Sequence, residues 1–366
     1  MKLNNTIKIS LLFFGLLFVG SKSYAQIQTF EWQGVQRQYL IRTPSQQENA
    51  IPVMFFLHGL GDNITHLDGQ FHFSQIAEQL GWAIVVPQAL NEGLGTMWNA
   101  GLMSSNTDDS GFLMALLDTL AEPYQLNLDS VFFTGFSMGG FMTHRMAIEH
   151  GDRIAACAPV SGLITFSMSN LTPVAPVRML HIHGTSDLVV GYDGNSQYFG
   201  GTLGLGVDAI LNYWKNANDC TDEPKIDSLP DLHNDGLRFI RYIYNCGTEL
   251  QHLKVIGGSH NWYNNSNQYD ISYLDEIYSF FKGNAGIDGV QEVGLGDLHV
   301  WPNPSKGRVE VELKEPTTIV VMNLQGQVLV QKQMEAGRSQ INLSHLATGL
   351  YLVKTQEGRV TKLVID

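Results

Sequence analysis

The sequence is poor in charged residues, and poorer still in basic ones. Charged residues make up 16% of the 366 positions, and 22 Lys and Arg stand against 35 Asp and Glu, which gives a net charge of −13. So low a charged fraction, beside 44% hydrophobic residues, excludes a disordered polyampholyte and favours a globular chain with a full core. The shortage of Lys and Arg argues against nucleic acid or an anionic membrane as a partner, because clustered basic side chains bind both.

Long apolar runs are lacking after the first 25 residues. The run Ile9–Val19 follows Lys2 and Lys8 and precedes the small-residue site Ser23-Tyr24-Ala25, which is the order of a secretory signal peptide over residues 1–25. The run is shorter than the roughly 20 apolar residues that a membrane-spanning helix needs. We therefore expect an exported, soluble chain that does not span a membrane.

Cysteine is scarce, with three residues in the whole chain. Cys157 lies in an apolar run and is predicted to be a buried, inert thiol. Cys220 and Cys246 flank a polar segment, and export would allow them to form a disulfide. By the loop-entropy model, such a bridge contributes on the order of 3 kcal/mol to stability. Two free surface thiols are the alternative.

Acidic residues are concentrated in the first three quarters of the chain. Residues 26–290 carry 11 basic and 27 acidic side chains, whereas residues 291–366 carry 8 of each. A Gly-rich stretch lies at this boundary and predicts a linker over residues 286–298. We therefore expect one domain over residues 26–285 and a second over residues 299–366.

The last 70 residues consist of short β-like runs separated by turn residues, which predicts a small all-β sandwich. They resemble the C-terminal sorting domain of the bacterial type IX secretion system in Trp301–Gly307, Asn323–Gln327, Ile341–Ser344, Leu346 and Gly349–Tyr351. Trp301 stands where that family usually has Tyr. The resemblance implies Sec export across the inner membrane, then passage of the outer membrane with the type IX machinery as a partner, usually with removal of the tail. A carbohydrate-binding β-module is the alternative.

Apolar runs alternate with helical patterns between residues 26 and 285. The predicted strands are Val53–Leu57, Ala83–Pro87, Val131–Gly135, Ala155–Val160, Val177–His183 and His252–Ile256. The predicted helices are Ser74–Gly81, Gly111–Leu120 and Met138–His150. This alternation predicts an α/β fold, with a mostly parallel sheet and helices on both faces.

The segment Gly135-Phe136-Ser137-Met138-Gly139 joins a predicted strand to a predicted helix. A G-x-S-x-G sequence in this position is typical of a nucleophile elbow, in which a strained turn exposes the serine. Small residues are needed at both glycine positions because the turn is tight. A free helix N-terminus behind the serine favours a developing anion. Ser137 is therefore the predicted nucleophile.

A serine nucleophile needs a base that is oriented by an acid. In α/β-hydrolases the acid and then the histidine follow the serine along the chain. Asp187 follows the strand that ends near His183, and His260 follows the last predicted strand. We therefore predict a Ser137–His260–Asp187 triad, with Asp193 as an alternative acid.

Other candidate sites are weaker. His181 and His183 share one face of a strand, a spacing that suits metal ligands, but no third ligand is evident, so no metal site is predicted. Asp108-Asp109 is interpreted as a solvated helix start. The oxyanion hole is predicted to use the backbone N–H groups of Met138 and of Leu60, in the loop that follows Leu57. His58 is expected to pin this loop by a structural hydrogen bond.

Residues 38–262 resemble the secreted polyhydroxybutyrate depolymerase family and the allied feruloyl and acetylxylan esterases of carbohydrate esterase family one, which are α/β-hydrolases. The matching segments are Leu57–Gly59, Val86–Gln88, Trp98–Gly101, Asp109–Leu113, Gly135–Gly140, His183–Asp187 and Gly258–Trp262. The resemblance implies that Ser137 is the nucleophile, Asp187 the acid and His260 the base, and it fits a Cys220–Cys246 bridge. Ser259 stands where the family more often has glycine.

The implied reaction is a two-step ester hydrolysis that needs no cofactor. Trp98 and Trp262 are predicted to flank the substrate, because aromatic faces suit sugar or feruloyl rings, with core packing as the alternative for both. The acidic body suits neutral polymers. Plant-wall xylan with acetyl or feruloyl groups is the first expected substrate, and a polyhydroxyalkanoate polyester the second. A peptidase and a non-catalytic binding protein remain as alternatives.

Overall fold

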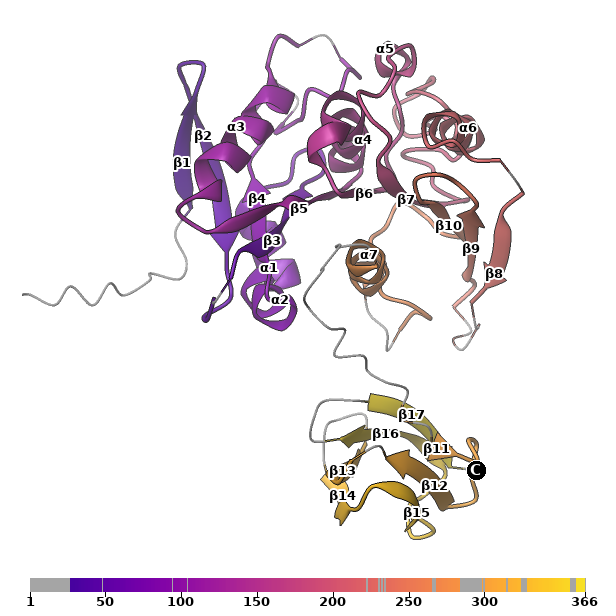
Figure 1. Ribbon diagram of the computed structural model, residues 1–366. Helices are drawn as coiled ribbons and strands as arrows, with labels where there is room; N and C mark the ends of the chain where they lie inside the picture. The colour runs from indigo at the N-terminus through magenta and orange to yellow at the C-terminus, as the bar shows by residue number, and fades with distance from the viewer. Residues whose placement is uncertain are drawn as a thin grey trace, which may run out of the picture. The chain divides into compact units, whose positions relative to one another are not determined.

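The computed structural model describes residues 27–365 except 48, 94, 104, 222, 230, 232, 234, 265–267, 284–297, 299, 314, 324–327 and 356–359. The predicted signal peptide and nearly all of the predicted linker lie outside the described residues. The chain separates into two compact units, Met1–Ala285 and Gly286–Asp366 (Figure 1).

A ten-stranded sheet runs through the first unit in the order β1-β2-β4-β3-β5-β6-β7-β10-β9-β8. Its strands are β1 Gln28–Trp32, β2 Val35–Arg42, β3 Ile51–Leu57, β4 Ala83–Pro87, β5 Leu126–Phe136, β6 Ala156–Val160, β7 Arg178–Gly184, β8 Lys225–Ser228, β9 Arg238–Tyr244 and β10 Leu250–Ile256. In the order of the sheet, the neighbouring strands β4, β3, β5, β6, β7 and β10 pair in parallel. The pairings made by β1, β2, β8 and β9 are antiparallel. The mostly parallel sheet of the prediction is confirmed, and the antiparallel strands at its two edges are additional.

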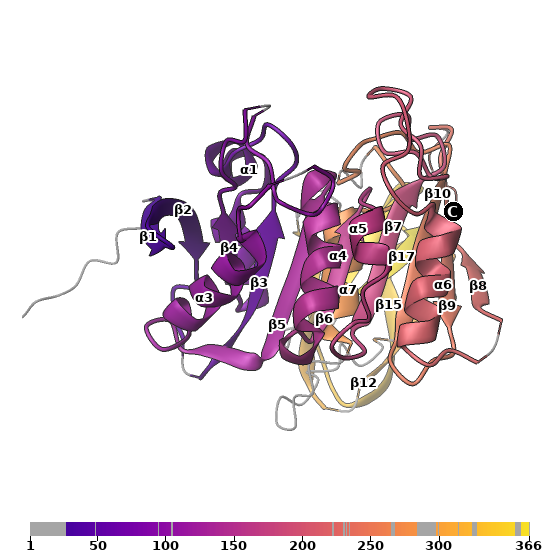
Figure 2. The ribbon, with the colours of Figure 1, turned by 90° about the horizontal axis from the view of Figure 1, so that it is seen from above.

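Helices cover both faces of this sheet (Figures 1 and 2). They are α1 Ile64–Phe71, α2 Phe73–Leu80, α3 Asp109–Ala121, α4 Met138–His150, the short 3₁₀ turn Gly151–Arg153, α5 Phe166–Ser169, α6 Val207–Ala217 and α7 Tyr273–Lys282. Apolar residues of α3, α4 and α6 form one core cluster, and those of α1, α2 and α7 form another. Because successive strand residues point to opposite faces, Phe55 of β3 belongs to the first cluster and Phe56 to the second.

The start of α3 differs from the solvated helix start predicted for Asp108-Asp109. Asp108 does cap the helix, since its carboxylate accepts from the Gly111 N–H at 2.9 Å. Asp109, in contrast, is fully buried and pairs with the equally buried Arg37 at 2.6 Å, so the prediction is wrong for this residue. Burial raises the pKa of the Asp109 carboxyl. Its second oxygen accepts from the Asn99 N–H, and the pair therefore ties β2, α3 and the loop before α3 together.

The second unit contains two antiparallel sheets, β11-β12-β15 and β14-β13-β16-β17. Their strands are β11 Val300–Trp301, β12 Arg308–Leu313, β13 Thr317–Met322, β14 Val328–Met334, β15 Gly337–Asn342, β16 Gly349–Thr355 and β17 Val360–Ile365. Alternate residues such as Val309 of β12 and Ile319 of β13 share one apolar core, as expected for a small sandwich. Among the described residues of both units, no helix is long and apolar enough to cross a membrane.

Candidate active site

Ser137 lies in a strained turn between β5 and α4. Its φ is +56° and its ψ −119°, a backbone conformation that non-glycine residues rarely adopt. Glycine is required on either side because any larger residue would clash: a Cβ on Gly135 would lie 2.6 Å from the Gly139 backbone. A Cβ on Gly139 would lie 2.0 Å from the Leu57 carbonyl oxygen. The predicted elbow therefore has the strain and the close backbone approach that its sequence demands.

Replacement of Gly139 tests the steric basis of this turn. We expect Gly139→Ala to lower the free energy of unfolding by about 3 kcal/mol, because the added methyl group meets backbone that must shift. Gly69→Ala is the matched control, since Gly69 lies in α1 with open space at its Cβ, and we expect it to be neutral or slightly stabilising. Urea unfolding of both variants provides the comparison, and equal midpoints would contradict the steric argument.

Two further loops at the carboxyl edge of the sheet bring Asp187 and His260 to Ser137. Asp187 follows β7 and His260 follows β10, and these two strands pair in parallel. The loops hold each other, since the Ser186 N–H donates to the Gly258 carbonyl at 2.9 Å. A Cβ on Gly184 would lie 2.3 Å from that same carbonyl oxygen, so the backbones are in close contact.

Hydrogen bonds connect the three side chains in one line. The His260 Nδ1 lies 2.7 Å from Asp187 Oδ2, and the His260 Nε2 lies 3.0 Å from Ser137 Oγ. An ionised carboxylate accepts only, so Nδ1 carries the hydrogen and Nε2 is free to accept from the Ser137 hydroxyl. The sequence-predicted residues are thus brought together, although they are 50 and 73 positions apart along the chain.

The environment of Asp187 favours its ionised form. The carboxylate is buried, and burial alone would raise its pKa. The hydrogen bond and charge of His260, together with the Val190 N–H, outweigh burial and hold the pKa of Asp187 below its ordinary value. Its Oδ1 accepts from the N–H groups of Val189 and Val190 at 2.9 and 2.8 Å, which fixes its orientation. Asp193, the alternative acid, instead bonds Asn195 in an exposed turn.

The loop after β3 passes beside Ser137. A Cβ on Gly59 would lie 3.6 Å from the Cβ of Ser137, and Leu60 lines the same cavity as Met138. His58 fixes the loop in the way the sequence suggested. Its Nδ1–H donates to the Gly59 carbonyl at 2.7 Å, and its Nε2 accepts from the Ala89 N–H at 3.0 Å. Burial lowers the pKa of His58, which keeps this acceptor unprotonated.

The expectation that Trp98 and Trp262 flank the substrate is wrong for this structure. Trp98 is 1% exposed, and its Nε1–H donates to the His58 carbonyl at 3.0 Å, so the indole supports the loop from beneath. Trp262 is 8% exposed and packs in the core against Phe56 and Phe71. Neither ring lines the cavity at Ser137. Both tryptophans thus follow the alternative of core packing, because their large apolar surfaces are better buried than solvated.

A cavity of about 620 Å³ opens at Ser137 and His260. Buried Met97 and Phe141 lie at its floor, whereas Met103 and the aromatic residues Tyr198 and Phe199 lie at its exposed rim. The cavity lies at the carboxyl edge of the parallel strands, because Ser137 follows β5 and His260 follows β10. This edge of the sheet is at the top of Figure 2, and ligands bind at this edge in open α/β sheets. Sequence reasoning missed these lining residues, because four of them come from loops without a recognisable pattern and Phe141 of α4 looks like an ordinary core residue.

Four histidines form a buried cluster beside the site: His144 of α4, His181 and His183 of β7, and His252 of β10. Their partners fix neutral tautomers, since His144 Nδ1 accepts from Trp214 Nε1 at 3.2 Å and His252 Nδ1 donates to the His181 carbonyl at 2.9 Å. Burial lowers the pKa of each, to about 3 for His144 and His252. Within the described residues, no three His, Cys, Asp or Glu side chains are arranged to hold a metal.

This cluster makes stability depend on pH. His144 and His252 bind a proton near pH 6.5 when unfolded but only near pH 3 when folded, so stability is lost as the pH falls below about 6.5. We expect a loss of about 2 kcal/mol for each of the two between pH 7.5 and pH 5. Urea midpoints at the two pH values measure this loss. The exposed His66→Gln variant should behave as the parent, and a midpoint that does not fall would contradict the cluster's role.

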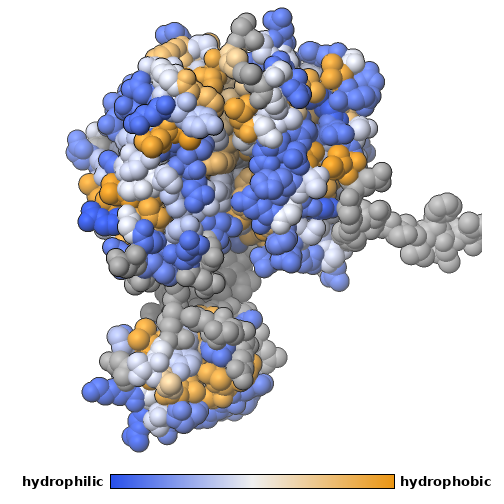
Figure 3. Space-filling model, turned by 180° about the vertical axis from the view of Figure 1, so that it is seen from behind, coloured by the Kyte–Doolittle hydropathy of each residue, from blue (hydrophilic) through white to orange (hydrophobic). Residues whose placement is uncertain are grey.

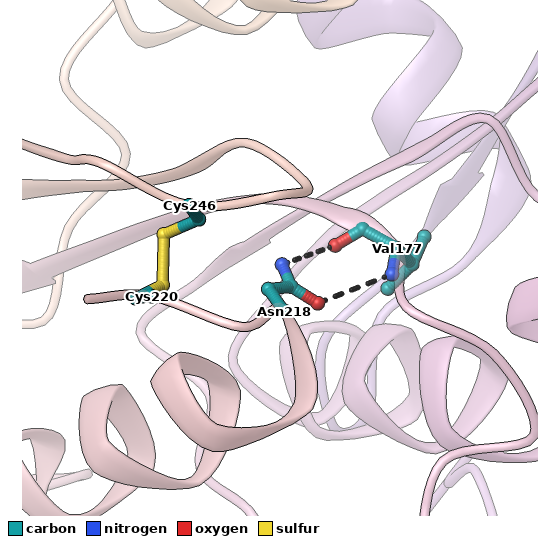
Figure 4. Close-up of a disulfide and its surroundings, with 4 residues drawn as sticks. All are labelled: Val177, Asn218, Cys220 and Cys246. Carbon is teal, nitrogen blue, oxygen red and sulfur yellow. Dashed lines mark hydrogen bonds between the residues drawn. A yellow bond between two sulfur atoms is a disulfide. The ribbon is translucent and has the colours of Figure 1, made fainter.

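A disulfide joins Cys220 and Cys246, as expected from the sequence (Figure 4). Beside it, the buried Asn218 at the end of α6 donates from Nδ2 to the Val177 carbonyl at 2.8 Å and accepts from the Val177 N–H. The hydrogen bonds of Asn218 fix the end of α6 to the start of β7, and the disulfide connects the segment after α6 to the segment after β9. The strand spans seven residues, roughly 23 Å, so the bridge lies at the opposite end of β7 from Asp187 and has a structural role. Cys157 is buried, and burial raises the pKa of its thiol.

The chain is similar in sequence to known esterases. The chain is 25% identical over 279 residues to the bifunctional acetylxylan esterase/xylanase of Neocallimastix patriciarum, a match that covers 75% of this chain and 37% of that protein. It is 28% identical over 229 residues to a probable feruloyl esterase C of Aspergillus niger, which covers 61% of this chain and 76% of that protein. This chain resembles feruloyl and acetylxylan esterases.

A solved structure shows the same fold. The acetyl xylan esterase from Aspergillus awamori superposes with a TM-score of 0.52 at 16% identity, over 70% of this chain and 99% of that one. The first unit is accordingly an α/β-hydrolase fold. Residues 299–366 match the family described as the secretion system C-terminal sorting domain, so the resemblance predicted for the tail is confirmed. A sorting domain of this kind marks the protein as secreted or located at the cell surface.

Proposed function

We propose that the protein is a secreted carboxylic-ester hydrolase that acts through Ser137, His260 and Asp187. The observation that carries the proposal is the continuous line of hydrogen bonds from Asp187 through His260 to the Ser137 hydroxyl, at the edge of an apolar cavity. The resemblance to feruloyl and acetylxylan esterases and the C-terminal sorting domain support it.

In the first step, Ser137 Oγ attacks the acyl carbon of the ester while His260 Nε2 takes the hydroxyl proton. The ionised Asp187 stabilises the imidazolium that forms and holds Nδ1–H toward itself. His260 then gives the proton to the departing alkoxide, so that the alcohol leaves and the acyl group stays on Ser137. In the second step, His260 takes a proton from water, the hydroxide attacks the acyl-enzyme, and the carboxylic acid is released with Ser137 restored.

The tetrahedral intermediates carry a negative oxygen that needs preorganised donors. The Met138 N–H lies in the first turn of α4, where no intrahelical acceptor exists, and the helix N-terminus favours an anion there. The Leu60 N–H is the second proposed donor, because its loop borders Ser137 and lines the cavity. His58 and Trp98 support that loop from behind and act as positioning residues.

For the natural substrate, we propose an ester carried by a neutral plant-wall polysaccharide, as in acetylated or feruloylated xylan. The relatives named for acetylxylan and feruloyl esters support this choice, and a net charge of −13 disfavours polyanionic polymers. The tail would direct export by the type IX machinery and be removed afterwards.

A substrate panel tests the proposal. The purified protein without residues 1–25 is assayed on p-nitrophenyl acetate, methyl ferulate, acetylated xylan and a polyhydroxybutyrate film. We expect release of acid from the soluble esters and from xylan. Release from the film with none from xylan would favour a polyester substrate instead. No turnover of any ester would contradict the proposed activity and favour a binding protein with this fold.

A further inference from the structure

A short hairpin places two aromatic rings in solvent at the mouth of the cavity. The side chain of Tyr198 is 75% exposed and that of Phe199 is 55% exposed, and their rings meet edge to face with 5.0 Å between centroids. Both residues line the cavity that contains Ser137 and His260. Large apolar groups are rarely left exposed together unless they meet a partner, so the pair needs an explanation.

The hairpin is held by hydrogen bonds of its own. Asn195 and Thr202 form an isolated bridge, with the Thr202 hydroxyl donating to Asn195 Oδ1 at 2.7 Å. The Ser196 N–H donates to the Gly201 carbonyl at 2.8 Å, and the Tyr198 N–H donates to the Leu188 carbonyl at 3.0 Å. Leu188 directly follows Asp187. The backbone that presents the two rings is therefore fixed to the segment that carries the acid of the triad.

The walls between this hairpin and Ser137 are apolar. The buried Met97 and Phe141 form the floor, and the exposed Met103 also lines the cavity. Among the described residues that line the cavity, Asp62 is the sole carboxylate. Residues of high hydropathy gather in the upper middle of the first unit in Figure 3, which views the molecule from behind. Such a wall offers apolar contact but few hydrogen-bond partners.

We propose that Tyr198 and Phe199 are specificity-determining residues that bind the acyl part of the ester, and that this acyl group is bulky and apolar. The inference rests on the proposed esterase function. A volume of about 620 Å³ lies in the range that accommodates a drug-sized ligand, so an acetyl group would leave most of it empty. A sugar ring would lose hydrogen bonds to water without replacement, and Asp62 disfavours an anionic acyl group.

The acyl group is also the part of the ester that can contact an apolar cavity wall in both chemical steps. It becomes bonded to Ser137 in the first step and is released only in the second, whereas the alcohol leaves in the first. Contacts to the acyl group therefore stabilise both transition states. The polysaccharide, which is rich in hydroxyl groups, would lie outside the apolar cavity and in solvent.

Esters that share one leaving group test this assignment. We expect the full-length protein without its signal peptide to show a kcat/KM at least about tenfold higher for p-nitrophenyl octanoate and cinnamate than for p-nitrophenyl acetate. In the Tyr198→Ala/Phe199→Ala double variant, this preference should fall by about tenfold. Phe166→Ala is the matched control, since Phe166 is 54% exposed on α5 and does not line the cavity, and it should keep the preference of the parent.

A binding measurement separates this proposal from the esterase proposal. In the Ser137→Ala background, calorimetric titration with octanoate should show affinity that is weakened about tenfold by the double substitution, with the thermal midpoint checking the fold. Acetate hydrolysis without acyl preference, or a preference that survives the double substitution, would overturn the assignment and leave the esterase standing. Octanoate binding without hydrolysis of any ester would contradict the esterase instead.

Discussion

The Ser137→Ala variant is expected to hydrolyse p-nitrophenyl esters with a kcat lowered by about 10⁴-fold or more. Alanine removes the hydroxyl oxygen that lies 3.0 Å from His260 Nε2, so no acyl-enzyme can form on this residue. The apolar cavity and the backbone N–H groups of Met138 and Leu60 remain, and a small residual rate over water should persist. Initial rates at saturating substrate measure the effect.

The control for this substitution is Ser169→Ala. Ser169 ends the short helix α5, is half-buried, and donates a local hydrogen bond to the Phe166 carbonyl. We expect its kcat to match that of the parent. If Ser137→Ala retained the turnover of the parent, the hydrolysis would take place elsewhere and the proposed nucleophile would be wrong.

The second large effect is expected at Asp187. Replacement by Asn keeps the shape of the side chain but presents an amide donor to His260 Nδ1, which favours the tautomer with hydrogen on Nε2. That tautomer cannot accept the Ser137 proton. We expect kcat at pH 7.5 to fall by about 10⁴-fold, with little change in the thermal midpoint because the Val189 and Val190 N–H groups can still bond the remaining carbonyl oxygen.

Asp193→Asn provides a chemically identical change in the same loop. Asp193 is exposed and bonds only Asn195 in the contacts that the structure describes, so its variant should keep parental kcat. This pair of variants also decides between the two acids that the sequence left open. A large loss in Asp193→Asn with none in Asp187→Asn would reverse the assignment.

Local sequence signals explain which parts of the fold were predictable. The elbow at Ser137 was recognisable because its two glycines are needed for local reasons. A Cβ on Gly135 would meet the Gly139 backbone, and a Cβ on Gly139 would meet Leu57 of the neighbouring strand β3. The parallel central strands were recognisable because burial on both faces makes them continuously apolar, as in Ala83–Pro87. The antiparallel edge strands are more exposed and mixed in composition, and they carried no such signal. In Lys225–Ser228, for example, all four residues are exposed.

The features that were missed depend on tertiary contacts. Asp109 looks like a second helix-capping residue until β2 brings Arg37 beside it. Trp262 stands two positions after His260, and Trp98 lies in a segment that resembles the esterase family, but the sequence does not say whether an indole faces substrate or core. Tyr198 and Phe199 lie in a hairpin that is fixed mainly by backbone hydrogen bonds, which leave no pattern in the side chains.

The central claim is that the acyl group is carried on Ser137 Oγ. The most direct measurement treats the protein with a fluorophosphonate that reacts with activated serines, and then locates the adduct by mass spectrometry of the intact protein and its peptides. We predict one adduct per chain, on the peptide that contains Ser137, and none in Ser137→Ala. An adduct on another residue, or equal labelling of the Ser137→Ala variant, would contradict the account.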